Sequence, residues 1–270
     1  MPYKVGPGRT RPGSSNDGRH AGRDKGTMTY CVALYLKDGL VMLSDTRTNA
    51  GVDHISSFGK MHLFEKPGER CMTLLAAGNL AITQAVVNLL REGVELGEEQ
   101  ATLATVPTMF RAAQLVGAAV RQVYRTDGEA MKAQGVGFDC SFLLGGQVKG
   151  RAMRLFQVYA AGNFIEATPD TPFFQIGEHK YGKPILDRVV SHDTAIEDGV
   201  KLVLISMDST LRSNLTVGLP IDLAIYRRDG LKLDMRRRIG EDDPYFRTVR
   251  DRWSAALRDV YRSIPTPDWE

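Results

Sequence analysis

Residues 28–47 read MTYCVALYLKDGLVMLSDTR. Two apolar runs rich in strand-forming residues flank the dipeptide Asp38-Gly39, which is a strong signal for a tight β-hairpin. The two strands of a hairpin run antiparallel, so the start of the first strand lies beside the end of the second. The sequence therefore predicts that Thr29, Asp45 and Arg47 are neighbours in space.

A lysine extends this group, because Lys60 precedes the next apolar run, Met61–Phe64. A threonine hydroxyl is a weak nucleophile at neutral pH and requires an adjacent base. If Thr29 begins the mature chain, its own α-amino group, with an ordinary pKa of about 7.7–8.0, can be that base. A nearby lysine ammonium favours the neutral amine, and an aspartate compensates the lysine charge. Thr29, Asp45 and Lys60 together predict nucleophilic hydrolysis, whereas each alone is also ordinary at a strand edge, a turn or a solvated surface.

This pattern resembles the proteasome β-subunit family of N-terminal-nucleophile hydrolases, in which the mature chain begins with threonine and an Asp-x-Arg follows a hairpin. Here Asp45 follows Thr29 by sixteen residues and Lys60 follows it by thirty-one. Within that family the chain is most similar to the bacterial ancestral-beta-subunit (Anbu) group. The motifs that carry this similarity are Thr-Tyr-Cys-Val-Ala at 29–33, Ser-Asp-Thr-Arg-Thr-Asn-Ala-Gly at 44–51 and Phe-Gly-Lys-Met at 58–61.

The resemblance extends from about Thr29 to about Arg237 and implies an α+β fold, a four-layer αββα sandwich, as a single domain over 29–270. The element order expected from the sequence is strands, two helices, strands, two helices and strands, in which helices cover two stacked sheets. Helices are expected over 81–92, 105–128, 183–190, 194–207 and about 244–263. A turn is expected at 145–150 and a strand at 215–218. The last helix carries Phe246, Trp253 and Tyr261 on one face, for packing on the body or on a neighbouring subunit.

Gly78 ends an apolar run directly before an expected helix. Glycine permits a positive φ or a close approach of the backbone, and the free N–H groups of a helix's first turn point outward. Gly78 is therefore a candidate for an oxyanion hole, as the resemblance also implies. The alternative is an ordinary turn glycine.

The resemblance further suggests which groups hold the Thr29 amine. Met207–Asn214 resembles the family's acidic loop, so Asp208 and Ser213 are the candidates, although such residues are also typical of capped turns. In relatives the turn that starts here at Gly177 often reads Gly-Ser-Gly. Glu178 stands near the place of that serine, so Glu178 or His179 is expected to shape specificity instead.

Residues 1–28 are dominated by Pro, Gly, Ser, Arg and Asn and offer almost nothing to bury, so we expect no fold there. They are a pro-segment removed before Thr29, a disordered basic tail, or an extension that is not translated. We favour the last, because Met28 followed by the small Thr29 is a start from which methionine is trimmed. If residues 1–28 stay attached, Thr29 lacks its free amine, and a scaffold subunit with little turnover becomes the better interpretation.

The bulk composition narrows the class of protein. A hydrophobic content of 43% and a charged content of 25% are typical of soluble globular proteins. The net charge of +3 is small and gives no argument for nucleic acid, and no apolar run approaches the roughly 18 residues of a membrane span. Three cysteines in strand-like runs indicate buried thiols and a reducing cytoplasm. No Cys/His spacing indicates zinc, so we expect neither a metal nor a cofactor.

The predicted function is that of a proteasome-type threonine peptidase or amide hydrolase acting on a peptide or protein substrate. A small-amide amidase and a weakly active or non-catalytic self-assembling scaffold are the alternatives. The resemblance also implies a homo-oligomer, either a ring or a low-pitch helix of about a dozen subunits. It names ATP-grasp-like and transglutaminase-like proteins as candidate partners.

Overall fold

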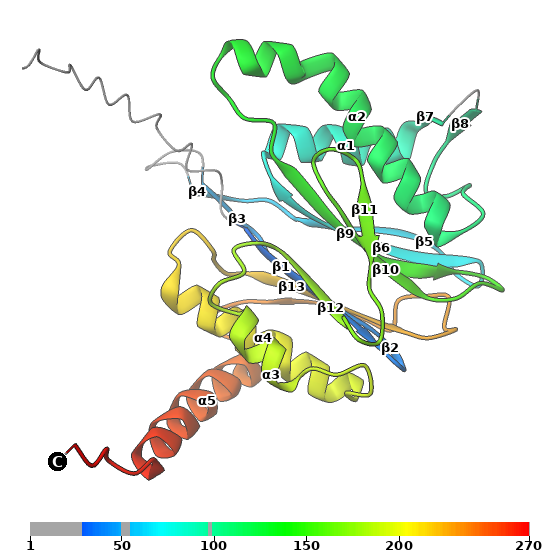
Figure 1. Ribbon diagram of the computed structural model, residues 1–270. Helices are drawn as coiled ribbons and strands as arrows, with labels where there is room; N and C mark the ends of the chain where they lie inside the picture. Colours follow the sequence, from blue (N-terminus) through cyan, green and yellow to red (C-terminus); the bar gives the residue numbers. More distant parts are fainter. Residues whose placement is uncertain (1–28, 50–54, 97–98, 270) are drawn as a thin grey trace, which may run out of the picture.

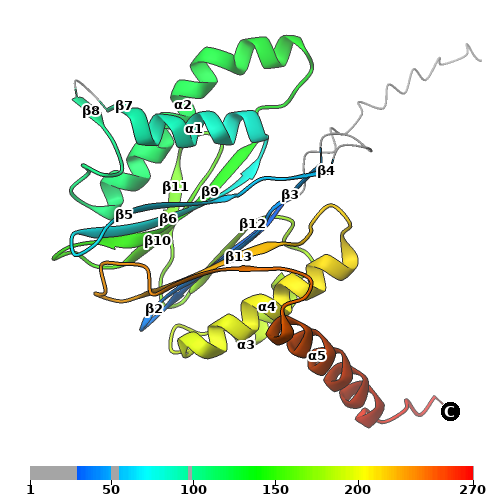
Figure 2. The ribbon, with the colours of Figure 1, turned by 180° about the vertical axis from the view of Figure 1, so that it is seen from behind.

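The computed structural model describes residues 29–49, 55–96 and 99–269. The predictions for residues 1–28 lie outside these ranges. Two five-stranded sheets stack face to face, and helices cover the outer face of each sheet, as Figures 1 and 2 show from opposite sides. The expected α+β fold with four αββα layers is confirmed.

The first sheet is antiparallel and has the strand order β12-β1-β2-β13-β14. Its strands are β1 (Tyr30–Leu36), β2 (Gly39–Asp45), β12 (Phe173–Gly177), β13 (Ile221–Arg227) and β14 (Met235–Ile239). The first two strands form the predicted hairpin, in which Cys31 pairs with Ser44. This register brings Thr29 and Asp45 to the same end of the sheet.

The second sheet has the order β11-β10-β9-β6-β5. Its strands are β5 (Met61–Lys66), β6 (Arg70–Gly78), β9 (Cys140–Val148), β10 (Arg154–Val158) and β11 (Phe164–Glu166). Two short strand pairs lie outside the main sheets, β3 (Arg47–Asn49) with β4 (Ile55–Ser57) and β7 (Val94–Leu96) with β8 (Glu99–Ala101).

Helices α1 (Leu80–Glu92) and α2 (Met109–Ala133) cover the second sheet, and α3 (Lys183–Val189) and α4 (Ile196–Ser213) cover the first (Figure 1). Helix α5 (Pro244–Ser263) begins against α4 and then extends away from the body in both views (Figures 1 and 2). Three apolar clusters fill the spaces between the layers, one on each helical side and one between the sheets. No helix in the described ranges is long and apolar enough to cross a membrane.

Three local predictions were wrong. Strand β9 continues through Gly145 and Gly146, which were assigned to a turn. A Cβ on Gly146 would lie 2.7 Å from the Cα of Met72, so this glycine reflects the close approach of β6. Helix α4 runs through residue 213 instead of ending at 207, and residues 215–218 form a turn instead of a strand.

Candidate active site

Lys60 and Asp45 form a buried ion pair at the end of the first sheet. Nζ of Lys60 lies 2.7 Å from Oδ1 of Asp45, and their side chains are 7% and 0% exposed. The ammonium also donates to the carbonyl oxygen of Arg47 at 2.6 Å, and the backbone N–H of Tyr30 donates to Asp45 Oδ1 at 3.2 Å. Burial raises the pKa of the Asp45 carboxyl, and the Lys60 ammonium opposes that rise. The pair therefore holds Lys60 in one place and ties it to the residue that follows Thr29.

A small cavity of about 40 Å³ has Thr29, Lys60 and Gly78 in its walls. Gly78 has a φ of +109°, and a Cβ there would lie 2.8 Å from the Cα of Cys140, so the position requires glycine. Asn79 caps the following helix by accepting a hydrogen bond from the N–H of Ala81 at 2.9 Å. The structure thus brings four predicted residues together: Thr29, Asp45, Lys60 and Gly78.

Four further polar side chains line this cavity: Thr83 and Gln84 of α1, Thr48 and His62. Thr48 is buried, and its hydroxyl has no hydrogen-bond partner in the part of the chain that the structure describes. Burial, together with the charges of Arg91 and Arg236, lowers the pKa of His62 to about 4. The imidazole is therefore neutral at neutral pH. The hairpin motif did not predict a role for Thr48 or His62.

The backbone of Thr29 is held by the end of β12. The N–H of Glu178 donates to the carbonyl oxygen of Thr29 at 2.6 Å. The preceding Gly177 has a φ of +79°, and a Cβ there would collide with that same carbonyl oxygen, so only glycine fits. The sequence analysis predicted no strand at β12.

Glu178 has a buried side chain, whose residue is 5% exposed. Its Oε1 accepts a hydrogen bond from the backbone N–H of Lys180 at 3.0 Å, and its Oε2 accepts one from the side-chain amide of Asn214 at 3.1 Å. Asn214 is the C-cap of α4 and is also buried. The sequence pattern did not single out Asn214, although its place directly after Ser213, among turn-forming residues, was a signal.

Arg47 holds the loop that follows α4. Its guanidinium donates to the carbonyl oxygen of Leu215 at 2.9 Å and lies against Gly218, where a Cβ would overlap it. The expected strand at 215–218 is absent because this segment folds around the guanidinium. Arg47 therefore fixes the loop 215–218 and does not itself line the cavity at Thr29.

Asp208 and Ser213 are not brought to Thr29. Asp208 accepts hydrogen bonds from Arg212 Nε at 3.0 Å and from Arg250 Nε at 2.8 Å, so its carboxylate serves the contact between α4 and α5. Because α4 continues to residue 213, Asp208 shares a helix face with Arg212. Ser213 lies exposed in the last turn of the helix. The prediction that these two residues hold the amine is corrected accordingly.

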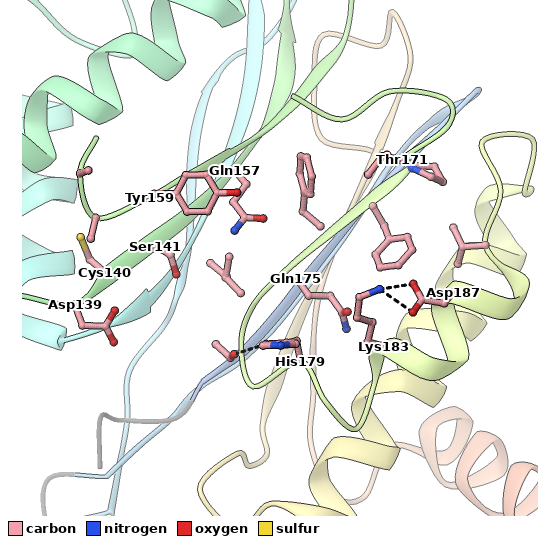
Figure 3. A pocket seen from close by; sticks show the side chains of 18 of the residues that line it. Asp139, Cys140, Ser141, Gln157, Tyr159, Thr171, Gln175, His179, Lys183 and Asp187 are labelled. Carbon is pink, nitrogen blue, oxygen red and sulfur yellow. Dashed lines mark hydrogen bonds and ion pairs between the residues drawn. The ribbon is translucent and has the colours of Figure 1, made fainter. Parts of the chain in front are cut away.

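A second, larger cleft of about 940 Å³ lies beside the site and ends at Gly177 and His179. In Figure 3 Gln175, His179 and Lys183 lie along one wall, and Asp139, Ser141 and Tyr159 along the other. Lys183 is paired with Asp187, and Nδ1 of His179 lies 3.3 Å from the carbonyl oxygen of Gly177. The cleft reaches Gly177, which lies against the carbonyl oxygen of Thr29, although Thr29 itself is not in its walls.

The three cysteines are buried free thiols, as the sequence predicted. Burial raises the pKa of Cys71 and of Cys140 to about 12 and raises that of Cys31 further. Over the described ranges, no group of three or more His, Cys, Asp or Glu side chains is arranged to hold a metal ion.

Comparison with known proteins identifies the family of this chain. The family model described as "Proteasome subunit" matches residues 24–226. The chain belongs to the proteasome subunit family. Among solved structures of that family, it is similar to Anbu proteins, the ancestral beta-subunit group. A comparison with curated proteins gives no match.

Three Anbu structures illustrate the similarity. An Anbu (Gly-1) mutant from Hyphomicrobium sp. strain MC1 is 54% identical, with 89% of this chain and 100% of that chain covered and a TM-score of 0.83. Anbu from Yersinia bercovieri is 50% identical, with coverage of 90% and 100% and a TM-score of 0.82. A structure described as the helical assembly of the Anbu complex from Pseudomonas aeruginosa is 48% identical, with coverage of 89% and 98% and a TM-score of 0.84.

Proposed function

We propose that this chain is a threonine amide hydrolase whose mature form begins at Thr29, after residues 1–28 are removed or never made. The hydroxyl of Thr29 attacks an amide carbonyl, and the free α-amine takes its proton. The N–H of Gly78 stabilises the oxyanion, and water then releases the acyl group. The observation that carries this proposal is the buried Lys60–Asp45 pair beside a cavity shared by Thr29, Lys60 and Gly78.

Each residue has a physical reason for its role. An ammonium beside an amine disfavours protonation of the amine, so Lys60 keeps the α-amine in its basic form. Lys60 also stabilises the negative charge that develops on the hydroxyl oxygen. Asp45 and the carbonyl oxygen of Arg47 fix the position of Lys60, so little reorganisation is needed during reaction.

The two cavities support a substrate with a small side chain next to the scissile bond and a longer segment on one side of it. The cavity at Thr29 is about 40 Å³, which suits a small side chain, whereas the cleft beyond Gly177 is about 940 Å³. A peptide or isopeptide fits both features. A small-amide amidase would use the first cavity alone.

The direct test is active-site labelling of protein that starts at Met28. A β-lactone or epoxyketone probe is expected to acylate or alkylate Thr29, and mass spectrometry of the N-terminal peptide locates the adduct. Thr29→Ala is the matched control. The absence of an adduct on Thr29, under conditions that label a known proteasome subunit, would sink the proposal.

We also propose that the chain assembles with copies of itself. The Pseudomonas aeruginosa relative is described as a helical assembly. Helix α5 supports the same behaviour here, because Leu257, Val260 and Tyr261 on it are 50%, 60% and 62% exposed. Exposed apolar side chains that gather on one element are typical of an interaction surface.

The exposed apolar side chains of α5 also fit a second candidate function, that of an assembled scaffold with little turnover. It becomes the better description if Thr29 remains an internal residue without a free amine. N-terminal sequencing of the protein from its native host separates the two. A chain that starts at Thr29 supports the hydrolase, and one that starts at Met1 supports the scaffold.

A further inference from the structure

Four carboxylates are buried in the part of the chain that the structure describes: Asp45, Glu178, Asp208 and Asp222. Three of them have cationic partners. Asp45 is paired with Lys60, Asp208 with Arg212 and Arg250, and Asp222 with both Nε and Nη2 of Arg238. Glu178 differs, because the partners of its two oxygens are the neutral groups Lys180 N–H and the Asn214 amide.

A buried charge is costly unless a second charge compensates it. Two neutral hydrogen bonds orient the Glu178 carboxylate but leave its charge uncompensated. Among the described residues no ion pair involves Glu178. In the full sequence Thr29 is joined to Met28 by a peptide bond, so its nitrogen carries no charge.

The register identifies where a compensating cation can arise. Tyr30 pairs with Gly177 at the ends of β1 and β12. Thr29 and Glu178 are the next residues beyond these ends, and the N–H of Glu178 donates to the carbonyl oxygen of Thr29 at 2.6 Å. Opposed residues in an antiparallel pair have Cα atoms about 4.5–5.5 Å apart. When the chain begins at Thr29, its α-amino group becomes a new cation within reach of Glu178.

We propose that Glu178 is the counter-ion and positioning residue of the Thr29 α-amine, with Asn214 holding the carboxylate in place. This inference rests on the proposed function, since it concerns the chain that begins at Thr29. Glu178, which was expected to shape specificity, takes over the role that the resemblance had suggested for Asp208 and Ser213.

The proton balance of the proposed reaction is consistent with this role. The neutral amine accepts the hydroxyl proton during attack and becomes an ammonium, which Glu178 stabilises. The ammonium then gives the proton to the leaving amine. The other charged or titratable residues around Thr29 and Glu178 are Lys60, Asp45 and Arg47, with His179 and Lys180 on the turn that carries Glu178; His62 on the cavity wall is neutral. Glu178 favours the protonated amine and Lys60 opposes it, so together they set its proton affinity.

The test is Glu178→Gln in protein that starts at Met28 and loses its methionine. The substitution keeps the size of the side chain and removes its charge. Trace acetylation of the α-amine by acetic anhydride across a pH series, quantified on the N-terminal peptide by mass spectrometry, gives the titration midpoint of the amine without any need for turnover. An anion within about 4–6 Å shifts such a midpoint by about 1–3 units, so we expect E178Q to lower it by at least about one unit.

Two further variants test whether the shift depends on a carboxylate at this position. E178Q/N214D moves the carboxylate to the other side of the same hydrogen bond and is expected to return the midpoint toward the wild-type value. Asp208→Asn removes a buried carboxylate that is paired with arginines and is expected to leave the midpoint unchanged. A midpoint in folded E178Q equal to that of the wild type would overturn the proposal.

If E178Q does not fold, a crystal structure of the mature wild-type protein decides. An α-nitrogen within about 4 Å of a Glu178 carboxylate oxygen supports the counter-ion, and a larger separation from both oxygens overturns it. One outcome would contradict the proposed hydrolase activity without contradicting the counter-ion. If the amine midpoint shifts in E178Q but no probe labels wild-type Thr29, the counter-ion stands and the catalytic proposal falls.

Discussion

Lys60 and Asp45 join the two sheets of the sandwich. Lys60 directly precedes β5 of the second sheet, and Asp45 is the last residue of β2 in the first, with 2.7 Å between Nζ and Oδ1. The ion pair is thus a contact between layers as well as part of the candidate site. Its removal is expected to affect folding and chemistry in ways that can be separated.

Lys60→Met leaves the Asp45 carboxylate buried without a cation. Loss of one partner of a buried pair costs about 3–5 kcal/mol, so the free energy of unfolding measured with urea should fall by about that amount. Labelling of Thr29 should slow by about 10²–10⁴-fold, the range typical of a lost proton-transfer arrangement. The double variant K60M/D45N should recover much of the stability and none of the labelling. A double variant as unstable as K60M would show that the two charges are not coupled.

Acid should weaken the fold through His62. Its pKa in the folded protein is lowered to about 4, below the ordinary value of 6.5 that we expect in the unfolded chain. Below pH 6.5 the unfolded state therefore binds a proton that the folded state does not. The free energy of unfolding should decline between pH 6.5 and 4, by up to about 3 kcal/mol from this group. The decline should be smaller in His62→Gln, and equal slopes in urea unfolding of both proteins would contradict the assignment.

The small cavity at Thr29 should limit the acyl-side residue of the substrate. At about 40 Å³, it favours probes that carry Ala, Ser or Asp at this position over those with Leu, Phe or Arg. His62→Ala enlarges the cavity and should shift the ratio of labelling rates toward larger side chains by about 10–200-fold, the range for small volume changes in a pocket. A series of peptide epoxyketones that differ only at this residue measures the ratio. Equal rates across the series would contradict a role for the cavity in selection.

Assembly should depend on helix α5. The helix buries Phe246 against the body, and the same apolar side then continues into exposed Leu257 and Val260. A groove of about 370 Å³ between α4 and α5, with Val249 and Trp253 in its walls, lies on this side. L257D/V260D is expected to convert the assembly to smaller species in light scattering, with unchanged stability of the separated subunit. Trp253→Ala should weaken the assembly less.

The control for this experiment is Asp251→Ala, because its spacing places Asp251 on the opposite side of α5. It should leave the assembly intact. A monomer at micromolar concentration in the unaltered protein would contradict the assembly itself, and an assembly unaffected by L257D/V260D would contradict the part played by the helix.

The sequence alone was sufficient to predict the hairpin and the position of its charged residues. Asp38-Gly39 and the two apolar runs have only one compact arrangement, and it brings Asp45 back to Thr29. Gly78 was identifiable because a glycine between a strand and a helix is typical of a backbone position with positive φ or a close neighbour. These inferences needed only local geometry.

The remaining parts of the site depend on contacts between segments far apart in the chain. Glu178 and Asn214 meet through β12 and the end of α4, and no local pattern specifies that meeting. Asp208 was misplaced because its arginine partner Arg250 lies on another helix. Because α4 extends to Ser213, Asp208 lies within the helix and not in a loop. Helix ends are the least certain part of a sequence prediction.

The interior position of β1 has a consequence for motion. Chain ends usually fray on fast timescales, because few backbone groups hold them. β1 is flanked on one side by β2 and on the other by β12, and the carbonyl group of Thr29 is itself bonded to Glu178. A chain that starts at Thr29 would therefore have a terminus that moves no more than a core strand. Such a terminus is released only by the cooperative opening of the whole sheet.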